Sequence, residues 1–212
     1  MHSAEHPSLK KMAKSVNHHE RKREICATSI RLFAQRGYED VNFGNIAKEC
    51  GLSRTLVYTY FKDKRTIFNQ AIFELTTAVA EKYRELAKSK QTADAKLREL
   101  CVTVFALLFD NRDFLCVIVD RLCNFRRMDR VPIENIMRHT LGFKRIVHSM
   151  IVEACHRGEY IPELDANRAT ALVYSQFEAA ILQLAVSGDA ILTSMIGQMN
   201  LLLNSFKNNE KK

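Results

Sequence analysis

The side chains best suited to chemistry lie between residues 42 and 64, where hydroxyl groups, a guanidinium group and aromatic rings crowd a short segment. Such groups hydrogen-bond to base edges and phosphates, and their apolar carbons pack on thymine methyl groups. Lys64 opens a predicted long helix, where the peptide dipoles and the ammonium group both favour a backbone phosphate. The segment therefore predicts a surface that contacts DNA. The candidate contact residues are Asn42, Phe43, Asn45, Ser53, Arg54, Thr55, Leu56, Tyr58, Thr59, Tyr60 and Lys64.

Residues 42–61 have the steric pattern of a helix-turn-helix, which would position these side chains. Ala47 is small where two helices must cross closely, and Gly51 permits the left-handed turn that reverses the chain. Val57, six residues further on, fills the space between the two helices. Helical hairpins with a purely structural role match the same spacing, so that alternative stays open on the spacing alone.

The stretch ICATSIRLFAQRGYEDVNFGNIAKECGLSRTLVYTYFKDKRTIF resembles the N-terminal DNA-binding domain of the TetR family of bacterial transcriptional regulators. The shared motifs are L-F-x-x-x-G ending at Gly37, I-A-x-x-x-G ending at Gly51, and Y-x-Y-F-x-x-K ending at Lys64. The match covers about residues 19–79. It implies a homodimeric repressor that binds a palindromic operator in double-stranded DNA and is released by a small-molecule effector.

This sequence departs from the family pattern at positions that would read bases. Gly44 stands where some members carry an arginine that reaches a base, so no base contact is transferred to that position. Thr55 and Leu56 replace the common Gly-Thr or Gly-Ser pair, and Arg65 replaces the usual glutamate after the lysine. The resemblance therefore predicts DNA binding without predicting the operator sequence.

Composition argues against an all-β protein, and periodicity predicts an all-α one. Only 7 glycines and 3 prolines occur in 212 residues, too few for many strands and hairpins. Helical periodicity predicts nine helices, which cover residues 20–36, 43–50, 54–61, 64–87, 93–109, 114–125, 133–157, 165–187 and 191–206. The basic residues 1–18 are interpreted as a flexible arm, residues 19–79 as the DNA-binding domain, and residues 80–212 as a ligand-binding and dimerisation domain.

The charge is uneven in a way that supports this division. Residues 1–70 hold 13 Lys and Arg against 7 Asp and Glu, a net charge of +6, while the remaining residues add only +2. A basic end on a nearly neutral remainder suggests a module that binds a polyanion, and a solvated basic tail is the alternative. No apolar run suggests a signal peptide or a membrane span, so we expect a cytoplasmic protein with no membrane partner.

The C-terminal domain is rich in phenylalanine, methionine and cysteine, which can line an adaptable pocket but more often form ordinary core. The candidate pocket residues are Phe105, Phe109, Phe114, Cys116, Asp120, Cys123, Met137, Phe143, Tyr174 and Phe177. The last two helices are so apolar that a second copy of the chain could cover them, the alternative being a monomer that buries them in its own core. The candidate dimer residues are Phe177, Ala180, Ile181, Leu184, Ile196 and Leu203.

Enzymatic chemistry is not indicated. The sequence has no H-E-x-x-H, G-x-S-x-G or P-loop motif, and we expect no catalytic residues, no cofactor and no metal site. Six cysteines are scattered without a C-x-x-C pair, which is typical of reduced, buried thiols. Two alternatives remain open at this stage: a regulator of the same fold whose cysteines sense redox state, and a helical interaction protein without a DNA target.

Overall fold

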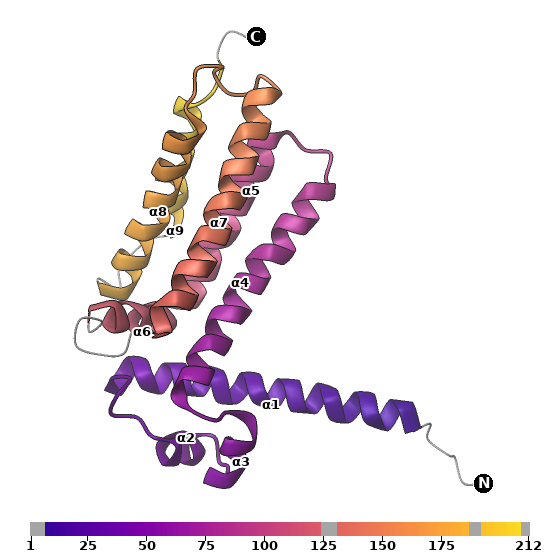
Figure 1. Cartoon of the computed structure of the whole chain (residues 1–212), viewed down its shortest axis with the longest axis vertical. Helices are drawn as coiled ribbons and strands as arrows, with labels where there is room; N and C mark the ends of the chain where they lie inside the picture. Colours follow the sequence, from indigo (N-terminus) through magenta and orange to yellow (C-terminus); the bar gives the residue numbers. More distant parts are fainter. Residues whose placement is uncertain (1–6, 124–130, 187–191, 209–212) are drawn as a thin grey trace. The chain divides into compact units, whose positions relative to one another are not determined.

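The structure is a computed structural model, which describes residues 7–123, 131–186 and 192–208, with only the backbone described for residues 7–16 and 131–137. These residues form helices and no strand, so the predicted all-α fold is confirmed (Figure 1). The helices are α1 (Pro7–Arg36), α2 (Phe43–Glu49), α3 (Arg54–Tyr60), α4 (Lys64–Lys88), α5 (Ala93–Asp110), α6 (Arg112–Cys123), α7 (Val131–His156), α8 (Ala166–Val186) and α9 (Leu192–Ser205).

The chain divides into two compact units, Met1–Ala71 and Ile72–Lys212. The division falls inside α4, eight residues before the boundary that the sequence pattern places after residue 79. The first half of α4 therefore belongs to the N-terminal unit, and the second half belongs to the C-terminal unit. Each unit has its own core and is described separately.

The N-terminal unit packs α1, α2, α3 and the start of α4 around a small apolar core. Ile25, Phe33, Ile46 and Phe68 are all at most 2% exposed. Gly37 ends α1 with a φ of +88°, as the sequence predicts, because only glycine adopts this left-handed conformation without strain. This core fixes the orientation of the two short helices that carry the candidate DNA contacts.

The start of α1 differs from the predicted flexible arm. The helix begins at Pro7, so residues 7–18 continue it by about three turns. Apolar residues recur at positions 9, 12, 13 and 16, the i, i+3, i+4, i+7 spacing of an amphipathic helix. That period is short and sits among charged residues, which is why the sequence pattern did not predict a helix there.

The C-terminal unit is a helical bundle in which α5, α7, α8 and α9 share a single core, with α6 packed against α8 (Figure 1). Leu97, Phe105, Ile151 and Val173 are almost completely buried in it. One helix, α8, is long and apolar enough to cross a membrane, with a mean hydropathy of 1.3 over an 18-residue window. A core helix passes the same test, and one face of α8 lies in this core.

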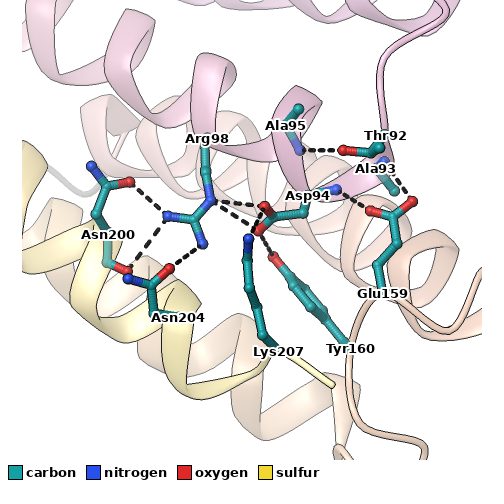
Figure 2. A network of polar contacts seen from close by, with 10 residues as sticks. All are labelled: Thr92, Ala93, Asp94, Ala95, Arg98, Glu159, Tyr160, Asn200, Asn204 and Lys207. Carbon is teal, nitrogen blue, oxygen red and sulfur yellow. Dashed lines mark hydrogen bonds and ion pairs between the residues drawn. The ribbon is translucent and has the colours of Figure 1, made fainter. Parts of the chain in front are cut away.

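A polar network holds one end of the bundle together (Figure 2). The carboxylate of Asp94 accepts two hydrogen bonds from Nε of Arg98 at 2.9 Å and one from the Tyr160 hydroxyl at 3.0 Å. Lys207 Nζ lies 3.1 Å from the same carboxylate, and Arg98 also donates to Asn200 Oδ1 at 2.8 Å. The network thus joins the start of α5 to α9 and to the segment after α7.

Glu159 completes this network by capping α5. Its two carboxylate oxygens accept hydrogen bonds from the backbone N–H groups of Ala93 and Asp94, at 3.0 and 2.8 Å. These N–H groups belong to the first turn of α5 and have no partner within the helix, so the carboxylate satisfies them and also complements the helix dipole.

Candidate DNA-binding surface and ligand pocket

The turn between α2 and α3 has the geometry that the sequence predicts. Gly51 has a φ of +64°, its N–H donates to the carbonyl of Lys48, and the N–H of Leu52 donates to the carbonyl of Ala47 at 2.9 Å. These two bonds form a Schellman motif, which ends α2 and reverses the chain. Val57 is 0% exposed and packs between the helices. The helix-turn-helix prediction for residues 42–61 is therefore confirmed in the fold.

The start of α2 uses two of the predicted contact residues for capping. Asn42 Oδ1 accepts hydrogen bonds from the N–H groups of Gly44 and Asn45, while Asn45 Oδ1 accepts one from the Asn42 N–H. This reciprocal capping box satisfies N–H groups that the helix itself leaves unpaired. The amide oxygens of Asn42 and Asn45 therefore orient α2, which leaves their NH₂ groups as the donors for another partner.

Phe43 is not positioned to contact DNA. Its side chain is only 5% exposed and its ring lies 4.5 Å from that of Tyr58, centroid to centroid. The aromatic pair instead fixes α3 against α2. The sequence prediction for Phe43 is corrected accordingly, because a hydrophobic residue directly after an N-cap packs inward here.

The outward face of α3 presents the groups that the sequence predicts for it. Ser53 caps the helix by accepting a hydrogen bond from the Leu56 N–H at 3.2 Å. Val57 is the buried residue of α3, and exposed polar and apolar side chains lie on both sides of it in the sequence. The exposed residues of α3 are Arg54, Thr55, Leu56, Tyr58 and Thr59.

Contacts within α3 already order this face. The guanidinium carbon of Arg54 lies 5.7 Å from the centroid of the Tyr58 ring, and its Nη2 donates to the Tyr58 hydroxyl at 3.4 Å. The Thr59 hydroxyl donates to the Leu56 carbonyl at 2.7 Å, so its oxygen can still accept a hydrogen bond and its methyl group can make apolar contacts. The half-buried Tyr60 stacks on His18 of α1, with the ring centroids 4.7 Å apart.

Lys64, a predicted phosphate contact, forms hydrogen bonds within its own chain. Its ammonium group donates to the backbone carbonyls of Tyr38 and Glu39, at 2.7 and 3.1 Å, and lies 4.8 Å from the centroid of the Tyr38 ring. These bonds tie the turn after α1 to the start of α4. The neighbouring Lys62 and Arg65 are exposed.

The C-terminal unit contains a mostly apolar cavity of about 480 Å³ between α4, α5, α6, α7 and α8. This size falls within the ordinary range for small-molecule sites. Four of the predicted pocket residues line it: Phe114, Phe143, Tyr174 and Phe177. The second half of α4 contributes several further side chains, among them Thr76 and Val79.

The other predicted pocket residues lie elsewhere. Phe105 is buried in the core, where its ring stacks on that of Phe177, and Phe109 packs against Arg112. Asp120 and Cys123 are exposed, and Met137 lies outside the described side chains. Cys116 donates from Sγ to the Ala185 carbonyl at 3.4 Å.

Polar groups occur in the cavity wall at a few positions. Arg84 of α4 and the pair Arg138 and His139 of α7 are among the lining residues. The Tyr174 hydroxyl donates to Thr140 Oγ1 at 3.3 Å. The cavity therefore combines a large apolar surface with guanidinium and imidazole groups, and no carboxylate is among its lining residues within the part of the chain that is described.

The contribution of α4 to the cavity was not predicted, because the sequence pattern assigned residues up to 79 to the DNA-binding domain. The apolar residues of α4 at positions 72, 75 and 79 have helical spacing, which was the available signal. Gly142 was also missed. It lies in the wall of the cavity within α7, where a Cβ atom would meet nothing within 4 Å.

The predicted dimer residues face the core of their own chain. Phe177, Ala180, Leu184 and Leu203 are at most 2% exposed, Ile196 packs against the core, and Ile181 lines the cavity. This corrects their assignment to an interface. The outward faces of α8 and α9 carry other apolar residues: Leu172, Leu182, Val186 and Leu201, which are 50–74% exposed.

Four of the six cysteines are poorly suited to redox sensing. Burial raises the pKa of Cys101 to about 12, and it also raises the pKa values of Cys50, Cys116 and Cys155 above their ordinary value. The thiolate is the form that reacts with oxidants, so a raised pKa makes these four thiols less reactive at neutral pH. The redox alternative thus gains no support from them.

Comparison with known proteins agrees with the fold and the helix-turn-helix. The family model described as bacterial regulatory proteins, tetR family, matches residues 25–71. The fatty acid metabolism regulator protein of Bacillus subtilis (strain 168) is 25% identical over 158 residues, which cover 74% of this chain and 80% of that protein. The HTH-type transcriptional regulator AcrR of Shigella flexneri is 30% identical over 110 residues, 50% of this chain and 51% of that one.

Solved structures share the whole architecture. FadR from Bacillus halodurans, a fatty acid degradation regulator, superposes with a TM-score of 0.71 at 18% identity, over 86% of this chain and 94% of its own. FadR from Bacillus subtilis, in complex with stearoyl-CoA, has a TM-score of 0.69 at 21% identity, over 85% and 96% of the two chains. At these identities the comparison establishes the fold alone.

A helix-turn-helix unit joined in one chain to a helical bundle with an apolar cavity defines the class of ligand-responsive DNA-binding regulators. Residues 25–71 match the DNA-binding domain of the TetR family of bacterial regulatory proteins, and the chain is a DNA-binding transcriptional regulator. The proteins that it resembles are regulators, a class whose members are generally not enzymes. The alternative of a helical interaction protein without a DNA target is not favoured.

Proposed function

We propose that this protein is a cytoplasmic repressor that binds a palindromic operator as a homodimer and dissociates when an anionic ligand with a fatty acyl chain fills the cavity. The cavity carries this proposal. Its wall is largely apolar, and burial of each CH₂ group of a chain contributes about 0.8 kcal/mol. Arg84, Arg138 and His139 provide positive or hydrogen-bonding groups for a carboxylate or phosphate head group.

Two of the comparisons support the choice of ligand. A relative from Bacillus subtilis is named a fatty acid metabolism regulator, and a solved structure of FadR from Bacillus subtilis contains stearoyl-CoA, so a fatty acyl-CoA thioester is the ligand that we propose for this chain. Such a molecule joins a long apolar chain to a head group with several phosphates, which matches the composition of the cavity wall.

Ligand binding acts on DNA binding only through a difference in affinity between two states. The ligand must bind the DNA-incompetent state more tightly, and a 100-fold preference corresponds to about 2.7 kcal/mol. Helix α4 is suited to this coupling because it supplies Ile67 and Phe68 to the N-terminal core and Thr76 and Val79 to the cavity wall.

A chain-length series tests the ligand proposal. Titration calorimetry with acyl-CoA thioesters of increasing length is expected to give an affinity that rises with each added pair of CH₂ groups until the cavity is full. The variant Arg84→Gln/Arg138→Gln should weaken every member of the series by a similar factor, because it removes head-group contacts only. Coenzyme A alone serves as the control. Equal affinity for the free coenzyme and for its long-chain thioesters would refute an acyl-binding cavity.

The exposed face of α3 predicts which side chains read bases. Replacing Arg54 or Thr59 with alanine is expected to change the preference between operator variants by about 1–3 kcal/mol at one or two base pairs, because these side chains approach base edges. Competition binding to single-base operator variants measures this. As a control, Lys62→Gln should weaken binding to all variants alike. If Arg54→Ala and Thr59→Ala also behave in that uniform way, they do not read bases.

The exposed apolar residues of α8 and α9 are the proposed dimer interface. Two apolar helices from each subunit can pack as a four-helix arrangement, and Leu182 and Leu201 are among the most exposed apolar residues on them. Recognition helices from two subunits would then reach major grooves about 34 Å apart.

The variant Leu182→Glu/Leu201→Glu is expected to be a folded monomer, because four carboxylates would be buried in the dimer but solvated in the single chain. Sedimentation equilibrium measures the mass, and operator affinity should fall by at least tenfold. Val102→Glu, an exposed position on α5, is the control. A double variant that remains dimeric would place the interface elsewhere.

A further inference from the structure

The N-terminal part of α1 lies beside the recognition helix. The His18 ring stacks on Tyr60 at 4.7 Å with an angle of 30° between the ring planes, and Lys22 Nζ lies 5.5 Å from the centroid of the Phe61 ring. Both contacts join α1 to the C-terminal end of α3. Residues 7–24 of α1 precede the region matched by the family model.

The same part of α1 is strongly basic. Between positions 7 and 23 the sequence has six Lys and Arg and a single Glu. At about 100° per residue, positions 11, 14, 18 and 22 fall within about 80° of one another around the helix axis. Positions 11 and 14 therefore lie on the same side of α1 as His18 and Lys22, the two residues that contact the end of α3.

We propose that the N-terminal extension of α1, residues 7–22, is a second DNA-binding element, which binds the sugar–phosphate backbone next to the groove that α3 enters. The proposal rests on the proposed function, because it needs α3 to bind the operator. The positive charge of the extension complements the DNA backbone, and the His18–Tyr60 contact makes the extension continuous with the recognition surface.

The length of the extension fits this role. His18 lies eleven positions after Pro7, which is about 16 Å of helix at 1.5 Å per residue. In Figure 1 the N-terminal half of α1 projects past α3. Phosphates follow one another every 3.4 Å or so along the axis for each strand, and the minor groove is about 6 Å wide. The extension is therefore long enough to reach phosphates beyond the edge of the major groove.

Salt dependence of operator binding tests the proposal. The variant Lys11→Gln/Lys14→Gln is expected to reduce the slope of log K against log salt concentration by about 0.9 for each phosphate that the variant no longer neutralises, while base preference stays unchanged. The control variant Lys88→Gln/Lys90→Gln removes the same charge from exposed positions of the C-terminal unit and should leave the slope unchanged. Hydroxyl-radical footprinting should show that Lys11→Gln/Lys14→Gln reduces protection only at the outer flanks of each half-site.

The outcomes separate this inference from the proposed function. If the unaltered protein selects no DNA sequence, the proposed function fails. If it binds an operator and Lys11→Gln/Lys14→Gln has the same salt slope and the same footprint, the operator proposal stands and the extension is not a DNA contact. Circular dichroism of both variants should show the same total helix content as the unaltered protein.

Discussion

Replacing Gly142 with phenylalanine is expected to weaken ligand binding by at least 100-fold while leaving operator binding intact. A Cβ atom at this position meets nothing within 4 Å, and the residue lies in the cavity wall, so a larger side chain has room to extend into the space that we assign to the ligand. Phenylalanine also has a higher helix propensity than glycine, so α7 should not be destabilised. A 100-fold loss corresponds to about 2.7 kcal/mol.

Gly142→Ala is the matched control, since it adds only a methyl group and improves helix propensity. The two variants should bind operator DNA equally well, and only Gly142→Phe should fail to dissociate when ligand is added. Fluorescence anisotropy of labelled operator, followed during ligand titration, measures both properties. If Gly142→Phe responds to ligand like the unaltered protein, the effector site lies outside this cavity.

Replacing Asp94 with alanine is expected to destabilise the protein by about 3 kcal/mol, because removal of one partner from a largely buried charge network leaves the others uncompensated. For a chain of this size the melting temperature should fall by about 6–12 °C, measured by calorimetry at pH 7. Glu85→Gln removes one negative charge from an exposed ion pair and should cost less than about 0.5 kcal/mol. Similar losses for both variants would mean that the network has no special role.

The effect of Asp94 should depend on pH. Burial would raise its pKa, but hydrogen bonds from Arg98, Lys207 and Tyr160 outweigh it and hold the pKa of Asp94 below its ordinary value. A lowered pKa contributes stability above the pKa of the unfolded chain, about 3.9, and that contribution is lost as the pH falls through the folded value. The stability difference between the unaltered protein and Asp94→Ala should therefore be constant near neutrality and shrink below about pH 4.

The helix-turn-helix was predictable from sequence because its constraints are local. A small residue, a left-handed glycine and a buried branched residue at 47, 51 and 57 determine a tight crossing whatever the remainder of the chain does. Capping residues Asn42 and Ser53 fix where the two helices begin. Once the helix crossing and the helix starts are known, the residues of α3 that face outward are known as well.

The C-terminal interfaces were less predictable because α8 is apolar on more than one side. Val173 and Phe177 face the core, whereas Leu172 and Leu182 face outward, and hydrophobicity alone does not distinguish the two sets. Inward-facing residues were consequently predicted to form the dimer interface. The hydrogen bonds of Lys64 were not predictable for a related reason, because its partners are carbonyls of a turn 25 and 26 residues earlier in the chain.

The central claim is that the α2–α3 surface, presented twice, recognises a specific duplex. Selection of bound fragments from a pool of random duplex DNA with the purified protein tests it most directly. We expect an inverted repeat whose half-sites lie about one helical turn apart, and release of the selected DNA by a long-chain acyl-CoA. Recovery of duplexes without any common sequence, or of a single unrepeated half-site, would contradict the claim.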